Sequence, residues 1–216
     1  MQGTLTAAVT KGVQSKKSCG VTIKHFACNN QEDNRMGVDV HVSERALREI
    51  YLRGFEIAVK NSNPVAMMSS YNLVNGVHAA NSKDLCTKIA REEWGFDGYV
   101  VSDWGAVNDR VSSLAAGLDL EMPPGDYEND RLIVKAVQEG KLDESVVDQA
   151  CERILNIIFR YTENRDEKAV FDYEKDHKAA AEIEAECMVL LKNENEILPL
   201  TSDKKNCIYR KICKDT

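Results

Sequence analysis

The sequence has few of the features that mark specialised classes of protein. None of its seven cysteines forms a CxxC pair, and no set of cysteines and histidines has the spacing of a zinc site. No apolar run approaches the roughly 20 residues of a membrane span. The N-terminal stretch MQGTLTAAVTKG also lacks a hydrophobic signal core. We therefore expect a globular, cytoplasmic chain whose thiols are free or buried, and we expect no metal and no cofactor.

Basic residues are also in short supply. The chain of 216 residues has 28 lysines and arginines against 35 aspartates and glutamates, which gives a formal net charge of -7. Only the pair Lys16–Lys17 and the C-terminal tail from Lys204 have clustered positive charge. Nucleic acids and anionic membranes need such clusters for binding, so neither is an expected partner. Cys207 and Cys213 lie close together in that tail, but nothing in the sequence favours a disulfide between them.

What the sequence does contain is an alternation of short apolar runs with longer segments of helical period. Four runs predict strands, at residues 21–26, 65–72, 99–105 and 118–123. Three segments predict the intervening helices, at residues 42–61, 82–95 and about 107–116. In the first of these helices one apolar stripe contains Leu47, Ile50, Tyr51, Phe55, Ala58 and Val59. Ser82 is a candidate N-cap and Gly95 a candidate stop for the second helix. Strands separated by helices predict βαβ units and a parallel sheet.

The pattern changes after Pro123. Helical segments then follow one another at residues 130–140, 143–164 and 173–193, with Asp143 as a candidate N-cap. We place a boundary between residues 160 and 172. The expected organisation is an α/β domain at residues 1–160 and a helical linker with the start of a further domain at residues 161–216.

Each predicted strand ends in residue types that carry chemistry or bind sugars. These endings are Lys24–His25, Ser70–Tyr71–Asn72, Asp103–Trp104 and Glu121–Met122. In (β/α) barrels the active site is built from several strands at their C-terminal edge. Taken singly, each ending has an ordinary explanation: a satisfied Lys–His pair, a core tyrosine, an aspartate that caps the helix near Val107, and methionine packing. Taken together, they favour one shared site for a neutral, polyhydroxylated ligand.

The segments KHFACNNQEDNR, VSERALREIYLRGFEIAVK, MMSSYNLVNG, REEWGFDGYVVSDWGA and AGLDLEMP together resemble glycoside hydrolase family 3 of the β-glucosidase type. The resemblance runs from about Gly12 to Leu200. It implies a retaining hydrolase of terminal β-D-glucosidic bonds that needs no cofactor. The fold it implies is the C-terminal half of a (β/α)8 TIM-type barrel, with four βα units and a helical extension.

By the same resemblance, Asp103 would be the catalytic nucleophile that attacks the anomeric carbon. Lys24, His25 and Arg35 would hold hydroxyl groups of the sugar in the −1 subsite, with Met68 and Tyr71 lining that subsite. Trp104 would form part of its wall. A nucleophilic carboxylate must stay ionised, and we expect nearby cations such as Lys24 and Arg35 to favour that form. Retention also requires a second carboxyl group about 5 to 5.5 Å from the nucleophile.

The sequence departs from the family pattern in two places. By analogy its four strands are the fifth to eighth of the barrel, so the half that supplies an Asp and an Arg to the −1 subsite is missing. MVLLKNENEILPL resembles the entry to the second, α/β sandwich domain of the family, but the tail KKNCIYRKICKDT that follows does not continue it. The usual acid/base carboxylate belongs to that second domain. Glu32, Glu92, Glu93 and Glu121 are available carboxylates without a family claim to the role.

Three functions stay open at this point. The chain is a β-glucosidase with a recognisable site, a catalytically silent sugar-binding or assembly fragment, or a β-xylosidase-type exo-glycosidase of the same family. The expected substrate is a β-linked gluco-oligosaccharide or an aryl glucoside. A half-barrel leaves exposed edges, so we also expect self-association through them or association with a complementary fragment.

Overall fold

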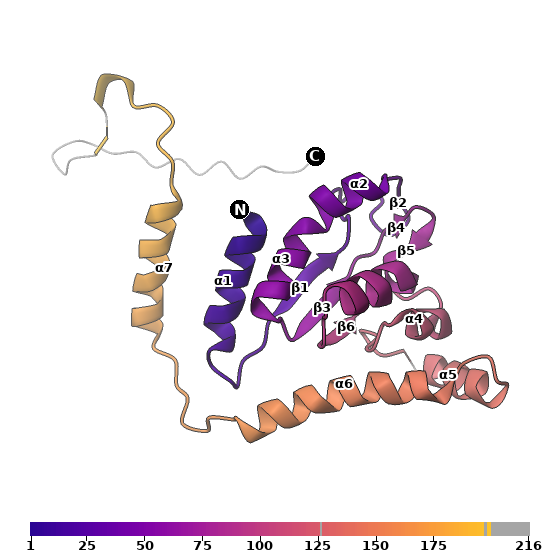
Figure 1. Cartoon of the computed structure of the whole chain (residues 1–216). Coiled ribbons are helices and arrows are strands. Elements are labelled where there is room, and N and C mark those ends of the chain that lie inside the picture. Colours follow the sequence, from indigo (N-terminus) through magenta and orange to yellow (C-terminus); the bar gives the residue numbers. More distant parts are fainter. Residues whose placement is uncertain (126, 197, 200–216) are drawn as a thin grey trace. The chain divides into compact units, whose positions relative to one another are not determined.

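The computed structural model describes residues 1–125, 127–196 and 198–199, and this part of the chain forms two compact units (Figure 1). The first unit runs from Met1 to Glu167 and the second begins at Lys168. All of the described strands lie in the first unit. Cys207 and Cys213, in the predicted tail, lie outside the described residues.

A parallel sheet forms the centre of the first unit. Strands β1 (Thr22–Phe26), β3 (Ala66–Ser69) and β6 (Tyr99–Val101) pair in the order β1-β3-β6. The central strand reads AMMS, with Ala66 and Met67 fully buried. Strands in parallel sheets read as continuous apolar runs of this kind rather than as an alternation. The prediction of a parallel α/β sheet is confirmed.

The fourth predicted strand, at residues 118–123, is not a regular strand. Its place beside β6 is taken by a single parallel bridge between Val101 and Leu120. The Ser102 amide donates to the Leu120 carbonyl at 2.9 Å, and the Ser102 hydroxyl accepts from the Met122 amide at 2.8 Å. Backbone hydrogen bonds at Leu120 and a side-chain hydrogen bond at Met122 therefore join this segment to β6.

The predicted helix at residues 42–61 forms in three parts. They are α2 (Glu44–Ala46), the π-helical turn η1 (Leu47–Tyr51) and α3 (Arg53–Ser62), and the Ser43 side chain caps the start. The predicted apolar stripe is only partly correct. Ile50 is 68% exposed, whereas Leu52, outside the stripe, is 1% exposed. A π turn contains more residues than an α turn, so it rotates the buried face relative to a strict 3.6-residue period.

Two further helices cover the sheet near β3 and β6. The π-helical segment η3 (Asp84–Glu93) begins after Ser82, whose hydroxyl accepts from the Leu85 amide at 3.2 Å. Gly95 follows it with a positive φ of 74°. Helix α4 (Arg110–Ala116) starts later than the predicted residue 107, because Asp109 is its N-cap and accepts from the Ser112 amide at 3.0 Å.

A second, three-stranded sheet was not predicted. It consists of β2 (Asp39–Val40), β4 (Leu73–Val74) and β5 (Val77–His78). Strand β2 precedes β3 in the chain, and β4 and β5 follow it. The hairpin β4–β5 turns at Asn75 and Gly76, which both have positive φ, 50° and 86°. Asn-Gly between two short apolar runs is a strong hairpin signal, so the sequence contained the information. The short 3-10 helix η2 (Ala79–Asn81) comes next.

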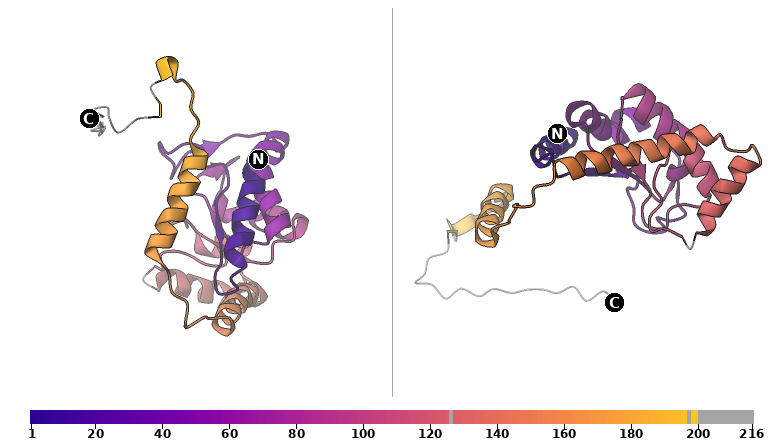
Figure 2. Two further views of the ribbon diagram at one scale, coloured as in Figure 1. Left: turned by 90° about the vertical axis from the view of Figure 1, so that its left-hand side faces the viewer. Right: turned by 90° about the horizontal axis from the view of Figure 1, so that it is seen from below.

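Helices α1, α5 and α6 complete the first unit. Helix α1 (Gln2–Gln14) packs against α3, while α5 (Glu128–Gln138) joins α4 and α6 in a small apolar cluster. Helix α6 (Glu144–Glu163) begins at Asp143, the predicted N-cap. It crosses below the strands in Figure 1 and passes in front of them in the view from below in Figure 2. Its Tyr161 hydroxyl donates to the Cys19 carbonyl at 3.0 Å.

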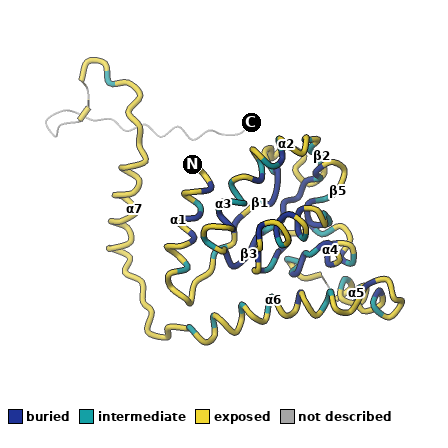
Figure 3. Tube along the Cα trace, viewed as in Figure 1, coloured by how far each residue is buried: buried dark blue, intermediate teal, exposed yellow. Residues whose placement is uncertain are grey.

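The main core lies between the parallel sheet and its helices. Phe26 of β1 meets Phe55 of α3 and Trp94 in edge-to-face contacts, with ring centroids 5.1 and 5.9 Å apart. The burial map in Figure 3 shows dark blue concentrated on β1, β3 and the neighbouring helical turns. Cys28 and Cys86 are buried in this core, whereas Cys19, Cys151 and Cys187 are exposed.

The second unit contains helix α7 (Tyr173–Cys187) and the 3-10 turn η4 (Glu194–Glu196). The predicted helix at residues 173–193 therefore ends six residues early, and the apolar residues 188–191 lie exposed outside it. Within the described residues, no helix combines the length and the apolar character that a membrane crossing requires.

Candidate active site at the C-terminal ends of the strands

The C-terminal ends of β1, β3 and β6 lie next to one another because the three strands are parallel. Phe26 is aligned with Ser69, and Met68 is aligned with Val101. The residues that follow, or end, these strands therefore meet at one edge of the sheet. This edge holds His25, Tyr71 and Asp103, which we call the rim cluster.

Asp103 lies at the centre of the rim cluster. Its Oδ2 atom is 3.4 Å from Nε2 of His25, and its Oδ1 atom accepts from the Trp104 amide at 2.8 Å. The side chain is 13% exposed, so it is shielded but reachable. Since Asp109 caps α4, the alternative that Asp103 serves as that helix's N-cap is wrong.

Tyr71 approaches the same carboxylate from the end of β3. Its hydroxyl donates to the Trp104 carbonyl at 3.0 Å, and the residue is 7% exposed. Burial, together with the neighbouring Asp103 carboxylate, raises the pKa of the Tyr71 phenol, and the Arg35 guanidinium opposes that rise. The phenol therefore stays protonated beside Asp103, as a hydrogen-bond donor must.

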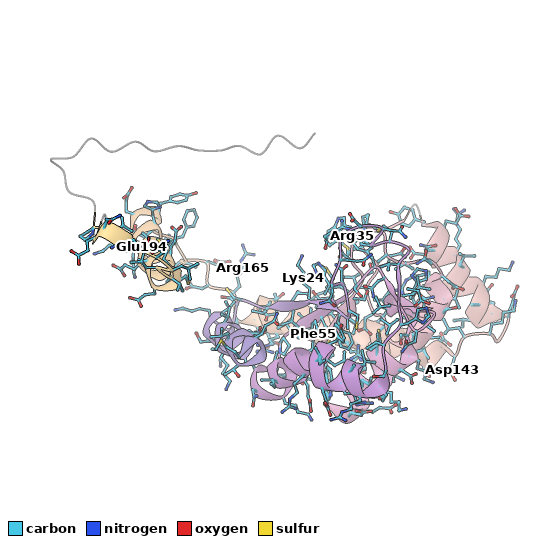
Figure 4. The ribbon with its side chains drawn as sticks, turned by 90° about the horizontal axis from the view of Figure 1, so that it is seen from above. Lys24, Arg35, Phe55, Asp143, Arg165 and Glu194 are labelled. Carbon is cyan, nitrogen blue, oxygen red and sulfur yellow. The ribbon has the colours of Figure 1, made fainter. Side chains whose placement is uncertain are left out.

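Arg35 reaches the rim cluster from the long loop after β1. Its guanidinium carbon lies 4.8 Å from the centre of the Tyr71 ring, and its Nη1 atom is 2.8 Å from Oε2 of Glu32. Figure 4 shows Arg35 on the same side of the unit as Lys24. A guanidinium over an aromatic face is a favourable cation–π contact, so Tyr71 helps to hold Arg35 at this edge.

The other predicted site residues are Lys24, Met68 and Trp104. Among the described residues, Lys24 forms no ion pair with Asp103. Lys24 is exposed and Met68 is partly buried, on the opposite side of β3 from Met67. The Trp104 ring is 53% exposed. The ionic contact of Asp103 within the described residues is with His25, and a role of Lys24 and Arg35 in favouring the ionised carboxylate stays a prediction.

Glu121, at the end of the fourth predicted strand, does not join the cluster. Its Oε2 atom is 3.6 Å from Nε of Arg110, and its Oε1 atom accepts from Nδ2 of Asn129 at 2.7 Å. The side chain is thus occupied by α4 and by the start of α5. The backbone of Met122 nevertheless meets the end of β6, because its carbonyl accepts from the Gly105 amide at 2.9 Å. All four strand ends therefore lie close together, but the Glu121 side chain turns away from the cluster.

The most elaborate polar cluster is one that sequence reasoning missed. The buried Asp119 carboxylate receives Arg91 at 2.6 Å, Arg153 at 2.9 Å and the Val100 amide at 2.7 Å. Burial lowers the pKa of Arg91, and Asp119 opposes that shift. Asp119 therefore ties β6 to η3 and α6. In LDLEMP, the charged Asp119 stands between two leucines, which is a local signal of a polar group at a buried position. Its partners Arg91 and Arg153 are distant in the sequence, so the local pattern does not predict them.

Residues 1–157 match the model of the glycosyl hydrolase family 3 N terminal domain. The chain belongs to glycosyl hydrolase family 3. It is 52% identical, over 91% of its length, to thermostable beta-glucosidase B of Acetivibrio thermocellus, and it covers 26% of that protein. It is 44% identical to an exo-alpha-(1->6)-L-arabinopyranosidase of Bifidobacterium breve, over 90% of this chain and 25% of the relative.

Solved structures of the family have the same fold. Beta-glucosidase 3B from Thermotoga neapolitana, in complex with glucose, superimposes with a TM-score of 0.85 at 47% identity. The match covers 92% of this chain and 29% of that protein. The chain thus spans about a quarter of the length of the curated relatives it matches. Its glycosidase lineage and its barrel-type α/β fold follow from these matches.

Proposed function

We propose that the chain carries the sugar-binding rim and the nucleophile of a retaining β-glucosidase, with Asp103 as the nucleophile. The observation that carries this proposal is the rim cluster, in which one carboxylate is contacted by His25 and flanked by Tyr71. The three paired strands and the Leu120 bridge are then the C-terminal half of a (β/α)8 barrel. The family match and the high TM-scores support that assignment.

The proposed reaction has two displacements at one carbon. A carboxylate oxygen of Asp103 attacks the anomeric carbon, and the bond from that carbon to the leaving-group oxygen breaks with its electron pair. The leaving group takes a proton from an acid, and a glycosyl ester of Asp103 forms. Water then attacks the same carbon, loses its proton to the conjugate base and releases the sugar and the Asp103 carboxylate.

The neighbours of Asp103 suit this chemistry. The His25 ring and the Tyr71 hydroxyl lie near the carboxylate, where sugar hydroxyls would bind. The Tyr71 hydroxyl donates to the Trp104 carbonyl, so its oxygen is available to accept from a sugar hydroxyl. Arg35 and Lys24 add positive charge on the same side of the unit. The exposed Trp104 ring offers an apolar face for stacking against a sugar.

The proposed reaction also needs an acid that protonates the leaving group. Glu32 is paired with Arg35, and Glu121 is held by Arg110 and Asn129, so neither is free to protonate a leaving group. We therefore expect the chain to react with substrates whose leaving groups depart as anions, and to turn over ordinary glycosides slowly or not at all.

The test is covalent trapping. The chain is incubated with 2,4-dinitrophenyl 2-deoxy-2-fluoro-β-D-glucoside, whose leaving group needs no acid and whose fluorine slows hydrolysis of the ester. Mass spectrometry of the intact chain and of its peptic peptides should show one added fluoroglucosyl group on Asp103. Asp103→Asn should abolish the adduct, and Asp97→Asn, at an exposed carboxylate, should leave it unchanged.

An adduct on a different residue would show that the assignment of Asp103 is wrong. No adduct, combined with glucose binding measured by calorimetry, would support the catalytically silent sugar-binding fragment instead. The proposal predicts an adduct.

A second substrate class has a specific observation in its favour. Relatives named as exo-arabinopyranosidases are 44% identical to this chain over 90% of its length, close to the figures for the β-glucosidases. Labelling with the corresponding fluorinated arabinopyranoside and xyloside, at equal concentrations, would rank the sugars. Faster labelling by a sugar without the C6 hydroxymethyl group would favour a pentose-specific exo-glycosidase.

A further inference from the structure

The chain forms a turn directly after β6, and this turn carries Asp103. The Asp103 carbonyl accepts from the Ala106 amide at 3.0 Å, and Gly105 has a positive φ of 76°. Apart from its chain neighbours, no heavy atom lies within 4 Å of the place where a Cβ of residue 105 would stand. The glycine therefore serves the backbone conformation, which residues with side chains rarely adopt. We call residues 102–106 the nucleophile turn.

The backbone of Met122 binds the nucleophile turn on both sides of Asp103. Before Asp103, the Ser102 hydroxyl accepts from the Met122 amide at 2.8 Å and donates to the Met122 carbonyl at 3.2 Å. After it, the Gly105 amide donates to the same carbonyl at 2.9 Å. Ser102 is fully buried, so water does not compete for its hydrogen bonds. Asp103 thus stands between two attachments to one residue.

The Ser102 hydroxyl takes the place of a backbone group. The Ser102 amide binds the Leu120 carbonyl, and in a regular parallel ladder the Met122 amide would then bind the Ser102 carbonyl. The Met122 amide binds the Ser102 hydroxyl instead. The backbone can therefore leave the strand one residue before Asp103 and still be attached to its neighbour. A serine hydroxyl can accept and donate at the same time, which suits it to bind both backbone groups of Met122.

The segment that ends at Met122 is itself held in place. The buried Arg110 of α4 donates to the Leu118 and Asp119 carbonyls at 3.3 and 3.2 Å. The backbone before Met122 is therefore tied to α4 as well as to β6. Met122 is a fixed point, and the Ser102 hydroxyl connects the nucleophile turn to it.

We propose that Ser102 is a positioning residue, whose hydroxyl fixes the direction in which the nucleophile turn presents the Asp103 carboxylate. This inference rests on the proposed role of Asp103 as the nucleophile. An attacking oxygen must lie about 3–3.5 Å from the anomeric carbon and in line with the breaking bond, so a displacement of about 1 Å slows the reaction about a hundredfold. Loss of the hydroxyl should slow the attack and leave sugar binding, which depends on the other strand ends, nearly unchanged.

The test measures how fast 2,4-dinitrophenyl 2-deoxy-2-fluoro-β-D-glucoside labels the full chain over a range of concentrations. Ser102→Ala should lower the rate constant at saturation at least about tenfold and change the half-saturating concentration less than about threefold. Ser102→Thr keeps the hydroxyl and should label within about threefold of the unsubstituted chain. Released dinitrophenolate gives the rate, and mass spectrometry gives the labelled residue.

Ser113→Ala is the matched control for a loss of stability. Ser113 is also fully buried, and its hydroxyl donates to the Asp109 carbonyl at 2.7 Å at the start of α4. Ser113→Ala should lower the free energy of unfolding about as much as Ser102→Ala, because each variant loses a buried hydroxyl, but its labelling rate constant should not change. Urea denaturation measures stability, and far-ultraviolet circular dichroism confirms that each variant is folded.

Gly105→Ala reaches the same turn without removing a hydrogen-bonding group. The added methyl group has room, but the positive φ of residue 105 becomes strained, so the turn should relax to another conformation. Labelling at saturation should slow at least about fivefold, again with little change in the half-saturating concentration.

Hydrogen exchange of backbone amides, followed by nuclear magnetic resonance, tests the attachment without any reaction. In Ser102→Ala the Gly105 and Met122 amides should exchange at least about tenfold faster, because their shared partner has lost the hydroxyl that holds it. The Val100 amide, which donates to the Asp119 carboxylate at 2.7 Å, should keep its rate.

Three results would overturn the proposal. They are a labelling rate constant of Ser102→Ala equal to that of the unsubstituted chain, equal slowing by Ser113→Ala, and Ser102→Thr as slow as Ser102→Ala. Failure of the proposed function looks different, because the unsubstituted chain would then form no adduct on Asp103. In that case faster exchange at Gly105 and Met122 would still support the attachment by Ser102, and unchanged exchange would overturn it.

Discussion

At the β1 edge of the sheet lies a groove that we call the β1 groove, lined by residues of α1, β1, η1 and α3. Its lining includes Lys24, which forms no ion pair among the described residues. At the opposite edge, the segment at residues 118–122 has no regular strand geometry, yet several of its polar groups are paired. Arg110 covers two carbonyls, and Asp119 receives Arg91 and Arg153. Among the described residues, we call the β1 side the open edge, because β1 pairs with β3 alone, and the side at residues 118–122 the closed edge.

The difference shows that carbonyls of the segment beside β6 can be bound by a side chain instead of a further strand. Guanidinium groups donate several hydrogen bonds in a fixed, planar arrangement, so one arginine can satisfy carbonyls that a neighbouring strand would otherwise pair. Helix α6 links the two edges, because Arg153 binds Asp119 and Tyr161 binds the Cys19 carbonyl just before β1.

The largest expected effect is at the closed edge. Asp119→Ala leaves two arginines without their buried partner and frees the Val100 amide, so the free energy of unfolding should fall by about 3–5 kcal/mol. Urea denaturation followed by circular dichroism measures it. Asp97→Ala, at an exposed carboxylate, should change stability by about 0.5 kcal/mol or less.

If Asp119→Ala does not fold, the milder variant Arg153→Gln gives a graded measurement, with an expected loss of about 1–2 kcal/mol. A loss under about 0.5 kcal/mol in both variants would show that the arginines do not hold this edge.

An intermediate effect is expected where α6 reaches the β1 side. Tyr161→Phe removes one hydrogen bond, to the Cys19 carbonyl, in a partly exposed position. The free energy of unfolding should fall by about 0.5–1.5 kcal/mol, measured by urea denaturation. Tyr173→Phe, at an exposed tyrosine of α7, is the matched control. A loss as large as that of Asp119→Ala would contradict the expectation that the contact of Arg153 with Asp119 stabilises the protein more than the contact of Tyr161 with the Cys19 carbonyl.

The smallest effect is a difference in rate between two buried thiols. Burial raises the pKa of Cys28, which lines the β1 groove, to about 11, and that of Cys86, near the closed edge, to about 12. A raised pKa leaves less thiolate at a given pH, and the thiolate is the nucleophile. With iodoacetamide at pH 8, the exposed Cys19, Cys151 and Cys187 should react first, then Cys28, and Cys86 last.

Timed alkylation with peptide mass spectrometry measures this order, and the chain in urea serves as the control in which all thiols react alike. Raising the pH by one unit should speed both buried thiols about tenfold. Reaction of Cys86 before Cys28 would contradict the order expected from the burial of the two thiols.

The sequence alone predicted the features that depend on local pattern. Apolar runs separated by helical periods predicted the parallel sheet, and Asp143 was identified as a helix cap, because both follow from residues near one another in the chain. Parallel strands bring their C-terminal ends to one edge, so the meeting of His25, Tyr71 and Asp103 was also predictable. The hairpin at Asn75–Gly76 was missed although its signal is local.

Only the tertiary structure decided which side chains become partners. It placed His25 rather than Lys24 against Asp103, turned Glu121 toward Arg110, and gathered Arg91 and Arg153 around Asp119. It also exposed Ile50 in the β1 groove, through a π turn that no periodic pattern shows. Sequence pattern specifies where a strand ends and which residue stands there. The direction of a side chain, and the distant residue it meets, depend on how helices and strands pack.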